Sequence, residues 1–551
     1  MVARIPLIVN PSVEQIQELP SGDSLSIPGD LDVTGTVTGS AIHSVKLPAD
    51  GTIAANAPVV LTTDGKVKAV AEGDPEAFGS ASTFFTHSGS EQVNYVRDLI
   101  WDSSQNAVLV AWGNNSKTEK VSSGTLSGTT ITWSGTHTTL NSSTDSSSTI
   151  PPAIATNNLG GGVAIYVPSS SSTSTSRGLF YKTFTLNGST ITWGTQTAIS
   201  AYASNTNEPD RPYCAYIGEE GGSHYFAVSY RYGDPGTNGQ RGKIRVLKWD
   251  GQDSVTVGAE SDVESANATT NHTRGNINPK IIPIDYGRFL YYDSTPSGVG
   301  VKGWIIANRS VNGTDIVDKS EPQTELTGDA AANYETFFNS SYMVYDPMSE
   351  YLYNVSGGQL HILTIDHGAI THRFKSDFPT GASGQIGITD KGEIIHSYIL
   401  SMFGNGKHNI GTLNGERNRI TWSSAATYAT NAGNFTGGSH LQPRVVKADD
   451  GKFIYAYFSG SANNEDGKAI VFQSATTTLT QDNFLGFSAA GYSDGNTASI
   501  SVLGSQSTQS GLTPGKKYYV QNDGTIGIGK SSFGVVAGKA LSATSLLITP
   551  V

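Results

Sequence analysis

The stretch GTLSGTTITW, residues 124–133, recurs with small changes and decides the fold. Close copies are FTLNGSTITW at residues 184–193 and GTLNGERNRITW at residues 411–422. Each copy places a glycine-containing turn between two short runs of Thr, Leu and Ile, which is typical of a β-hairpin. A hairpin that recurs along a chain predicts a fold assembled from copies of one structural unit.

The tryptophans that end these copies give the repeat length. Trp133 and Trp193 are 60 residues apart, and Trp422 lies 229 residues further on, which is four periods of about 57 residues. The gap should therefore hold three weaker copies. Candidates at the expected places are KWDG (248–251) before VTV (255–257), VNG (311–313) before IV (316–317), and DHG (366–368) before IT (370–371).

A second pattern repeats with the same phase. It consists of an apolar run, a polar turn and an aromatic-rich run, as in RDLIWDSSQNAVLVAW at residues 97–112. Further copies follow at residues 151–167, 211–230, 278–293, 340–355, 383–399 and 442–458. Each copy has the residue chemistry of a hairpin. Together the two patterns predict units of four strands, with seven units between residues 92 and 478.

Units of four strands at this period are typical of a β-propeller, in which each blade is a small sheet. Ring closure lets every blade bury both faces against its neighbours. Composition agrees, because charged residues make up only 15 % of the chain and Tyr, Phe, Val, Ile and Thr fill the apolar runs. We predict an all-β chain with a seven-bladed β-propeller. The repeated tryptophans should fill space between blades.

The flanks of the repeats predict two further parts. Residues 1–43 have Gly or Pro every few positions and are expected to form an extended anchor or stalk. Residues 44–80 should form a few short strands around a DGK turn, and residues 479–551 five or six more. We therefore divide the chain into the anchor at 1–43, two halves of a small β-domain at 44–80 and 479–551, and the propeller at 90–478.

The two halves of this small domain resemble a β-domain that recurs in tailed-phage structural proteins. The matching residues are DGK at 64–66, FLGF at 484–487, GLTPGKKYYV at 511–520 and VVAGKALSATSLLI at 535–548. In that family the first hairpin runs directly into the F-x-G segment, whereas here the repeats intervene. We infer a propeller inserted into a small β-sandwich or barrel-like domain, whose halves should lie side by side. The string ARIPLIVNPSVEQIQELPSGDSL, at residues 3–25, also resembles the starts of tailed-phage proteins, notably cyanophage and marine-phage ones.

The resemblance implies a virion structural protein of the fibre or spike type. Such a subunit would be assembled in the host cytoplasm, joined to other virion proteins through its N-terminal segment, and present in the virion as a homotrimer. The propeller would then be displayed as a non-catalytic adhesin for host-surface polysaccharide. Two alternatives remain open. One is a capsid- or tail-bound decoration protein with a structural propeller, and the other is a glycan-degrading enzyme of the sialidase or depolymerase kind.

Charge and cysteine content narrow the function classes. The net charge is −12 and no basic stripe is present, which argues against a nucleic-acid partner. No window is apolar enough for a membrane span, so we expect no membrane insertion. Cys214, the only cysteine, lies in the apolar run RPYCAYI and should be a buried, unreactive thiol.

Candidates for catalysis are weak in the sequence. The Thr-Trp endings lack the preceding Asp turn of sialidase-type propellers, and the arginines (Arg97, Arg177, Arg211, Arg231 and Arg241) follow no repeated phase. The adjacent acidic pairs at 219–220, 449–450 and 465–466 fit solvated turns better than the separated carboxylates of a glycosidase. We therefore predict a chain that is not an enzyme and has no catalytic or cofactor-binding residues.

Metal sites are also weakly indicated. His361 and His367 could face the same way on a strand, but would be about 20 Å apart, and His372 lies further on. The acidic turns ADDG at 448–451 and NNEDG at 463–467 could supply oxygen ligands to Ca²⁺, although neither has a full calcium-loop pattern. We assign no metal ligand and keep Ca²⁺ at these turns as an alternative.

A binding surface of aromatic and polar side chains fits the adhesin hypothesis best. Aromatic rings stack on sugar rings, and Asn or Asp side chains bond to their hydroxyls. The candidate binding residues are Tyr225, Tyr230, Tyr232, Asp234, Tyr291 and Tyr292. The same tyrosines also fit a role in the core of the sheets.

Overall fold

The protein is described by a computed structural model. The described residues are 6–10, 15–18, 44–88, 91, 93–114, 118–142, 152–167, 178–200, 210–232, 241–262, 279–285, 287–293, 304–317, 342–347, 349–356, 358–366, 369–380, 384–389, 392–399, 404–414, 418–432, 443–449, 451–461, 464–480, 482–529 and 534–549. Within them the chain is all-β, as the sequence predicted, and the one helical element is a 3-10 turn at Ser103–Gln105. These residues include no helix long and apolar enough to cross a membrane.

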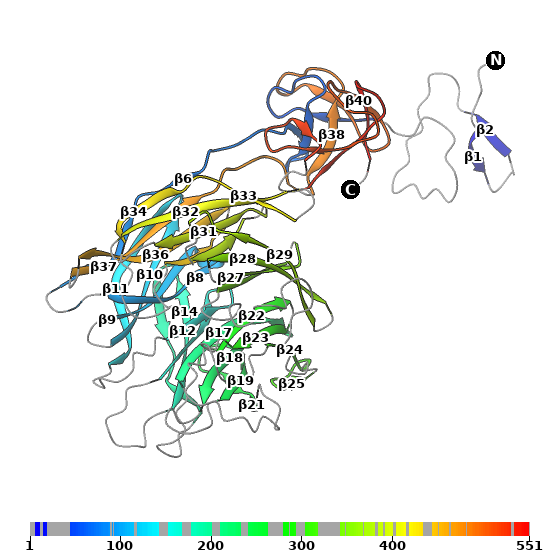
Figure 1. Ribbon diagram of the computed structural model, residues 1–551. Coiled ribbons are helices and arrows are strands. Elements are labelled where there is room, and N and C mark those ends of the chain that lie inside the picture. The colour runs from blue at the N-terminus through cyan, green and yellow to red at the C-terminus, as the bar shows by residue number, and fades with distance from the viewer. Residues whose placement is uncertain are drawn as a thin grey trace.

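The central part of the chain folds into consecutive antiparallel sheets in which neighbouring strands follow one another along the chain (Figure 1). The first comprises β8 (Val93–Asp102), β9 (Ala107–Asn114), β10 (Thr118–Ser127) and β11 (Thr130–Ser142). The second comprises β12 (Ala153–Thr156), β13 (Gly161–Tyr166), β14 (Leu179–Asn187), β15 (Thr190–Trp193) and β16 (Thr197–Ser200). The third comprises β17 (Asp210–Glu220), β18 (Ser223–Tyr232), β19 (Arg241–Trp249), β20 (Val255–Val257) and β21 (Ser261–Asp262).

The later sheets keep this order. They are β22 (Pro279–Asp285), β23 (Arg288–Asp293), β24 (Trp304–Arg309) and β25 (Ile316–Val317), then β26 (Tyr342–Asp346), β27 (Tyr351–Ser356), β28 (Gln359–Asp366) and β29 (Ala369–Asp377). Next come β30 (Gln385–Ile388), β31 (Ile394–Ile399), β32 (Gly404–Leu413), β33 (Ile420–Trp422) and β34 (Ala426–Ala432), then β35 (Arg444–Lys447), β36 (Lys452–Ser461) and β37 (Asn464–Gln473). Ala432 of β34 also pairs with Ser459 of β36, which joins the last two sheets.

The first strands of these sheets contact one another in a closed order. β8 lies beside β12, β12 beside β17, β17 beside β22, β22 beside β26, β26 beside β30, β30 beside β35, and β35 again beside β8. Apolar side chains fill the space between successive sheets, for example Leu109, Tyr166 and Phe184 between the first two. The arrangement is propeller-like, and the core is divided among the interfaces between sheets.

The sheet of β35–β37 takes its outer strands from an earlier part of the chain. β6 (Ala77–Phe78) and β7 (Ser82–Phe85) both pair with β37. Phe84 and Phe85 are buried there against Trp112 of the first sheet. The sequence analysis had assigned residues 44–80 to the small domain, but Ala77–Phe78 belong to this sheet instead. Apolar runs as short as β6 and β7 do not indicate which strand they pair with.

The repeated tryptophans connect neighbouring sheets. The Nε1 of Trp133 donates to Ser82 Oγ of β7 at 2.9 Å, that of Trp193 to Thr138 Oγ1 of β11 at 2.9 Å, and that of Trp422 to Ser376 Oγ of β29 at 3.2 Å. In each case the acceptor lies on the outer strand of the preceding sheet. The rings themselves are half-buried against the cores between sheets, as the sequence predicted for space-filling residues.

Two kinds of connection lie at opposite ends of the ring, because successive strands of each sheet run in opposite directions. Short turns join first to second strands and third to fourth strands at one end, which we call the turn end. Residues 128–129 and 221–222 are two such turns. Connections from second to third strands, and from each sheet to the next, lie at the opposite end, which we call the loop end.

A small domain of two sheets forms from both flanks of the ring. One sheet has the order β3–β39–β38–β4–β5, with β3 (Ser44–Pro48), β4 (Pro58–Leu61) and β5 (Val67–Ala69) beside β38 (Phe484–Ser488) and β39 (Thr497–Ser501). The other has the order β40–β44–β43–β41–β42, from β40 (Gln506–Thr508), β41 (Lys517–Val520), β42 (Ile526–Gly527), β43 (Val536–Ala540) and β44 (Ser545–Leu547). Val60, Leu479, Phe487 and Val520 share its core.

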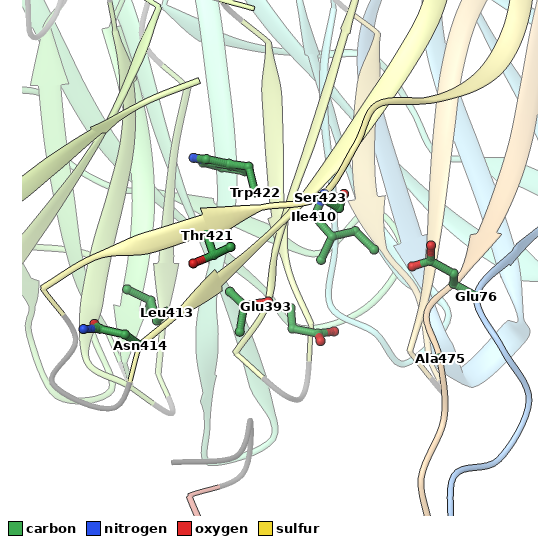
Figure 2. Close-up of a pocket in the computed structure, with 10 residues that line it drawn as sticks. Glu76, Glu393, Ile410, Leu413, Asn414, Thr421, Trp422, Ser423 and Ala475 are labelled. Carbon is green, nitrogen blue, oxygen red and sulfur yellow. Dashed lines mark hydrogen bonds between the residues drawn. The ribbon is translucent and has the colours of Figure 1, made fainter. Parts of the chain in front are cut away.

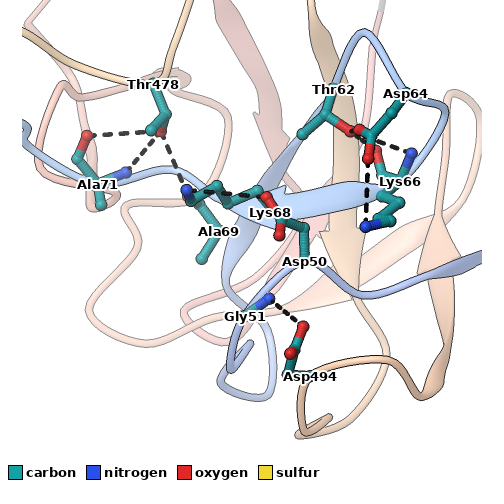
Figure 3. Close-up of polar contacts among 10 residues, drawn as sticks. All are labelled: Asp50, Gly51, Thr62, Asp64, Lys66, Lys68, Ala69, Ala71, Thr478 and Asp494. Atoms are coloured by element: carbon teal, nitrogen blue, oxygen red, sulfur yellow. Dashed lines mark hydrogen bonds and ion pairs between the residues drawn. The ribbon is translucent and has the colours of Figure 1, made fainter.

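Polar contacts hold the two flanking segments together (Figure 3). The Gly51 amide donates to Asp494 Oδ1 at 2.8 Å, and Thr478 Oγ1 accepts from the Ala71 amide at 2.9 Å. The segments that lead from the domain to the ring are themselves paired, because the Gly73 amide donates to the Thr476 carbonyl at 2.9 Å. The small domain is thus tied to the turn end by a two-stranded ribbon.

The predicted anchor at residues 1–43 is described only in part. β1 (Pro6–Asn10) and β2 (Gln15–Glu18) form an antiparallel hairpin. The other residues of 1–43 lie outside the described part of the chain.

Candidate functional site

The tyrosines chosen from the sequence are not on an accessible surface where their side chains are described. Tyr225 and Tyr230 have 0 % of their surface exposed and Tyr291 has 1 %. A sugar cannot stack on a ring whose faces are covered, so the structure removes these three from the candidate surface. Tyr232 and Tyr292 lie on β18 and β23, but their side chains, like all of Asp234, lie outside the described part.

These tyrosines fail as surface residues because of their place in the sheets. Strands β18 and β23 are second strands, covered on both faces by neighbouring sheets. The guanidinium of Arg309 lies 3.7 Å from the centre of the Tyr225 ring, and Tyr230 donates a hydrogen bond to Glu260. Such contacts satisfy buried aromatic residues within the fold.

A different set of polar side chains gathers where the first strands begin, at the loop end of the ring. Asp98, Tyr213, Lys280, Gln385 and Arg444 occupy matching positions on β8, β17, β22, β30 and β35. The residues two positions further along these strands, such as Ala215, Ile282 and Val446, pack against the following sheet. Arg97 precedes Asp98 at a register shift in the β8–β9 ladder, where an extra residue changes side-chain direction. We call these six residues the axial cluster.

Hydrogen bonds fix several members of the axial cluster to the next sheet. Asp98 Oδ2 accepts from the Ile154 amide at 3.1 Å, and Gln385 Oε1 accepts from the Val445 amide at 2.8 Å. The Arg444 Nε donates to the Val96 carbonyl at 3.3 Å. First strands expose an unpaired backbone edge toward the axis, and these side chains satisfy part of that edge.

Charges of this cluster influence one another although they come from different sheets. The pKa of Lys280 on β22 is lowered in part by the charges of Arg444 and Arg97, and that of Tyr213 on β17 is raised in part by the charge of Asp98. Arg97, Asp98, Tyr213, Lys280 and Arg444 all remain half-buried, so solvent reaches them.

Burial and like charge shift the pKa values in this cluster. Burial, with the nearby charges of Arg444 and Arg97, holds the pKa of Lys280 well below its usual value. Burial raises the pKa of Asp98, although the Ile154 amide and the two arginines oppose that shift. Burial, reinforced by the charge of Asp98, also raises the pKa of the Tyr213 hydroxyl. Tyr213 is therefore neutral at physiological pH and acts as a hydrogen-bonding group.

Arg97 also faces a second carboxyl group. Glu119 of β10 is 3 % exposed, and burial raises its pKa well above the usual value, with only Arg97 opposing the shift.

A proline before three members of the axial cluster marks their positions in the sequence, although residue type alone does not. Tyr213, Lys280 and Arg444 each follow a proline in the repeated stretches RPY, NPK and QPR. Proline suits an edge strand because its missing amide needs no partner. Alignment of the repeats would have shown one variable, mostly polar position at the start of each first strand.

A separate hollow lies at the turn end, beside the outer strands of the last two sheets (Figure 2). It has a volume of about 520 Å³ and is open to solvent. Glu393 and Asn414 border it from turns, and Glu76 and Ala475 from the ribbon that leads to the small domain. Its other lining residues are Ile410, Thr412, Leu413, Thr421, Trp422 and Ser423. The small domain leaves the ring beside this hollow. The hollow is therefore poorly placed to contact a large outer surface.

The histidines form a pair that the sequence analysis did not identify. His361 Nδ1 and His372 Nε2 are 3.3 Å apart across β28 and β29, and both residues are buried. His367 lies outside the described residues. Burial, with the charges of His372 and Lys375, lowers the pKa of His361 to about 4. Among the described residues no group of three His, Cys, Asp or Glu side chains could hold a metal ion.

The acidic turns considered for Ca²⁺ or catalysis lie partly outside the described residues, or their carboxylates already accept hydrogen bonds within the fold. Asp450 and Asn463 lie outside the described residues. Asp466 Oδ1 accepts from the His87 amide, and Glu220 Oε2 accepts from Arg309 Nη1.

Cys214 is 5 % exposed, and burial, together with the charge of Asp98, raises the pKa of its thiol well above the usual value. The prediction that this thiol is buried is confirmed.

Comparison with known proteins identified no family. No family model matches the chain. No curated protein matches it either.

Solved structures align with most of this chain, but at low similarity. The polysaccharide lyase Uly1 covers 78 % of this chain and 100 % of its own, with 11 % identity and a TM-score of 0.40. A protein of unknown function from Dyadobacter fermentans covers 73 % and 100 %, with 10 % identity and a TM-score of 0.37. A subtype N11 neuraminidase-like protein of A/flat-faced bat/Peru/033/2010 covers 78 % and 97 %, with 7 % identity and a TM-score of 0.36. We draw no functional argument from overlaps of this size.

Proposed function

We propose that this chain is a tailed-phage virion protein of the fibre or spike type, in which a seven-bladed propeller is inserted into a small β-domain. The propeller presents its loop end to host-surface glycan and binds it without cleaving it. The N-terminal segment joins the subunit to other virion proteins, and three copies assemble together.

The observation that carries the proposal is the opposite placement of the small domain and the axial cluster. The small domain leaves from the turn end through a paired ribbon, so a particle attached through it would hold the loop end outward. The loop end carries the half-buried polar side chains of the axial cluster. Binding residues concentrate in proteins where connecting segments meet a rigid scaffold.

A glycan-degrading enzyme is the second candidate, and one feature favours it. The raised pKa of Asp98, beside the Tyr213 hydroxyl, is a property that a general acid requires. A glycosidase of the usual kind needs a second carboxylate about 5–9 Å away. Glu119, which interacts with Arg97, is a second carboxyl group beside the cluster, and burial raises its pKa as well.

The test is binding of the purified protein to intact host cells and to their extracted surface polysaccharide, with reducing ends assayed in the same tube. Binding without release of reducing ends is expected. Release of reducing ends that disappears in Asp98→Asn would replace the adhesin with the enzyme. Absence of binding to every permissive host would leave only a structural platform.

Blocking one end at a time identifies the surface that binds. Thr380, in a loop-end connection, is exposed, and Leu159, in a turn-end hairpin, is 60 % exposed. We would attach a bulky maleimide polymer to Thr380→Cys and, as the matched control, to Leu159→Cys. Native Cys214 is buried and should not react. The polymer at position 380 should abolish binding and the polymer at position 159 should not, and the reverse result would contradict the proposed orientation.

A further inference from the structure

We propose that Lys120 and Asn114 join through an amide bond between their side chains, and that Glu91 catalyses this self-modification. The three residues lie at the loop end, where β9 and β10 meet the segment that precedes β8. The reaction is independent of the proposed function, because it depends only on the contacts among these residues and the Thr118 amide.

One carboxylate oxygen holds the two reacting groups together. Glu91 Oε1 accepts a hydrogen bond from Asn114 Nδ2 at 2.7 Å and forms an ion pair with Lys120 Nζ. Lys120 pairs with Trp112, and Asn114 lies two residues beyond Trp112, so both side chains stand on one face of the sheet. Because both nitrogens bond to the same oxygen, they are less than about 6 Å apart. The flexible lysine stem can cover the distance that remains to the roughly 3–3.5 Å needed for attack.

Glu91 is positioned and ionised for proton transfer. Its backbone is fixed by reciprocal hydrogen bonds with Ser88, at 3.0 and 3.2 Å. Burial would raise the pKa of its carboxyl group, but the bonds from Lys120 and Asn114 outweigh burial and hold that pKa below its usual value. Glu91 is therefore a carboxylate at neutral pH, and it can accept the proton that Lys120 must lose before attack.

Aromatic rings border the ammonium group and limit its contact with water. Lys120 Nζ is 5.4 Å from the centre of the Trp112 ring and 5.8 Å from that of Phe85. The His137 ring packs against both of these rings, and only 15 % of the Lys120 side chain is exposed. Charges are costly where water is excluded, so these surroundings reduce the cost of passing the proton from Lys120 to Glu91, which leaves both groups neutral.

The Asn114 side chain is oriented for attack. Its Oδ1 accepts a hydrogen bond from the Thr118 amide at 2.7 Å, while its Nδ2 donates to Glu91. A backbone N–H can only donate and a carboxylate can only accept, so these partners fix which end of the side chain is the oxygen. The Thr118 N–H therefore lies where negative charge develops on Oδ1 during attack, and it stabilises that charge.

The reaction exchanges one amide for another. Lys120 Nζ, after passing a proton to Glu91, attacks Asn114 Cγ, and an electron pair of the carbonyl moves to Oδ1. When the carbonyl forms again, the bond between Cγ and Nδ2 breaks, and Glu91 delivers the proton to Nδ2. The second proton that Nζ loses follows the same route, so the nitrogen leaves as ammonium. No oxidant, reductant or further reactant is needed.

A second pair of a lysine and a carboxylate provides an internal comparison. Lys243 Nζ lies 2.8 Å from Glu260 Oε1, and 11 % of the Lys243 side chain is exposed. Glu260 also bonds to Tyr230 and Arg245, neither of which carries a side-chain amide. Lys243 should therefore stay unmodified, although it is paired and buried to a similar degree.

The test is the intact mass of the folded full chain, measured by mass spectrometry before and after incubation at mildly alkaline pH. We expect a mass lower than the sequence mass by one molecule of ammonia. Trypsin does not cleave after an acylated lysine, so the digest should contain residues 98–117 joined to residues 118–177. Cleavage after Lys243 should be normal.

Three variants separate the roles of the residues. Lys120→Arg keeps the charge but lacks the amine, so it should keep the full sequence mass. Glu91→Gln keeps the size of the side chain but cannot accept the proton, so it should slow the reaction at least about a hundredfold. Lys66→Arg is the matched control, an exposed lysine paired with Asp64 in the small domain, and it should lose ammonia as the wild-type chain does. Circular dichroism would show that each variant is folded.

The other outcomes overturn the proposal in whole or in part. A folded wild-type chain that keeps its full mass after incubation contains no such bond. Loss of ammonia without the joined peptides also contradicts the proposal, because an asparagine before glycine, such as Asn187, can lose ammonia by cyclisation. If the loss persists in Lys120→Arg, Lys120 is not the nucleophile. If the joined peptides form at the wild-type rate in Glu91→Gln, the bond exists but Glu91 is not its catalyst.

Discussion

The turn end and the loop end of the ring are built from the same strands but differ in the contacts that their charged side chains make. At the turn end Arg309 is paired, since its Nη1 lies 2.6 Å from Glu220 Oε2 and its guanidinium covers the Tyr225 ring. At the loop end Arg444 Nε donates to the Val96 carbonyl of the next sheet at 3.3 Å, and Asp98 Oδ2 accepts from the Ile154 amide at 3.1 Å. The contact at the turn end joins two charged side chains, and those at the loop end join charged side chains to backbone groups.

This difference follows from the direction of the strands. Short hairpin turns bring neighbouring strands together, so a charged side chain there finds a partner within the same or the next sheet. First strands begin at the loop end with an edge that no further strand pairs, and polar side chains there bond to backbone groups of the next sheet. The turn end therefore tests how charged side chains stabilise the fold, and the loop end tests the proposed binding. The following predictions test this contrast, from the largest expected effect to the smallest.

Closure of the ring should have the largest effect. Phe84→Ala removes a side chain that is 2 % exposed and packs against Trp112 and Trp133. We expect a loss of about 3–5 kcal/mol in the free energy of unfolding, because a large cavity forms between the sheets that close the ring. Urea unfolding would measure it. Thr83→Ala, an exposed change in the same strand, should cost less than about 0.5 kcal/mol.

The paired cation of the turn end should come next. Arg309→Met leaves Glu220 without its partner and removes the contact with Tyr225. We expect the protein to lose about 2 kcal/mol of stability, within the range for breaking a partly buried pair. A double-mutant cycle with Glu220→Gln would measure the coupling. A coupling near zero would mean that the turn end does not use this pair for stability.

Acid should destabilise the sheets between the two ends. The pKa of His361 and of His408 is lowered to about 4, chiefly by burial, against an ordinary value of about 6.5. The unfolded chain therefore binds protons first, so stability is complete above about pH 6.5 and falls as the pH drops toward 4. Each histidine should cost about 2 kcal/mol at pH 5.

Urea unfolding at pH 7.5 and pH 5 would measure this loss. His408→Phe keeps a ring beside Phe78 and Phe472 but cannot take a proton, so it should reduce the difference between the two pH values. An unchanged difference would show that other groups cause the acid sensitivity.

The repeats made much of the architecture accessible from the sequence. The hairpins at 124–133, 184–193 and 411–422 lie on third and fourth strands, and so do the three weaker copies proposed between them. The second pattern lies on first and second strands throughout. Period and phase could be recognised because each sheet needs the same turns and the same apolar faces. The hairpin pattern is absent from the last sheet because β6 and β7 supply its outer strands from before the first sheet.

The candidate site was less accessible. Tyr225, Tyr230 and Tyr291 were chosen because aromatic residues are common in glycan sites, but a tyrosine on a second strand is buried by the sheets on either side. Arg97 was considered only as an arginine without a repeated phase. Arg97 and Arg444 lie about 350 residues apart, and no local pattern records that their strands β8 and β35 are neighbours in the ring.

The sequence alone determined that this protein is all-β, that its strands come in repeated hairpins, and that Cys214 is buried. Those properties follow from local residue preferences and from apolar runs, which act over a few residues. Only the tertiary structure decided which strands close the ring, which tyrosines are covered, and which polar side chains bond to the next sheet. Those properties depend on contacts between residues far apart in the chain, which form only when the sheets pack around a common centre.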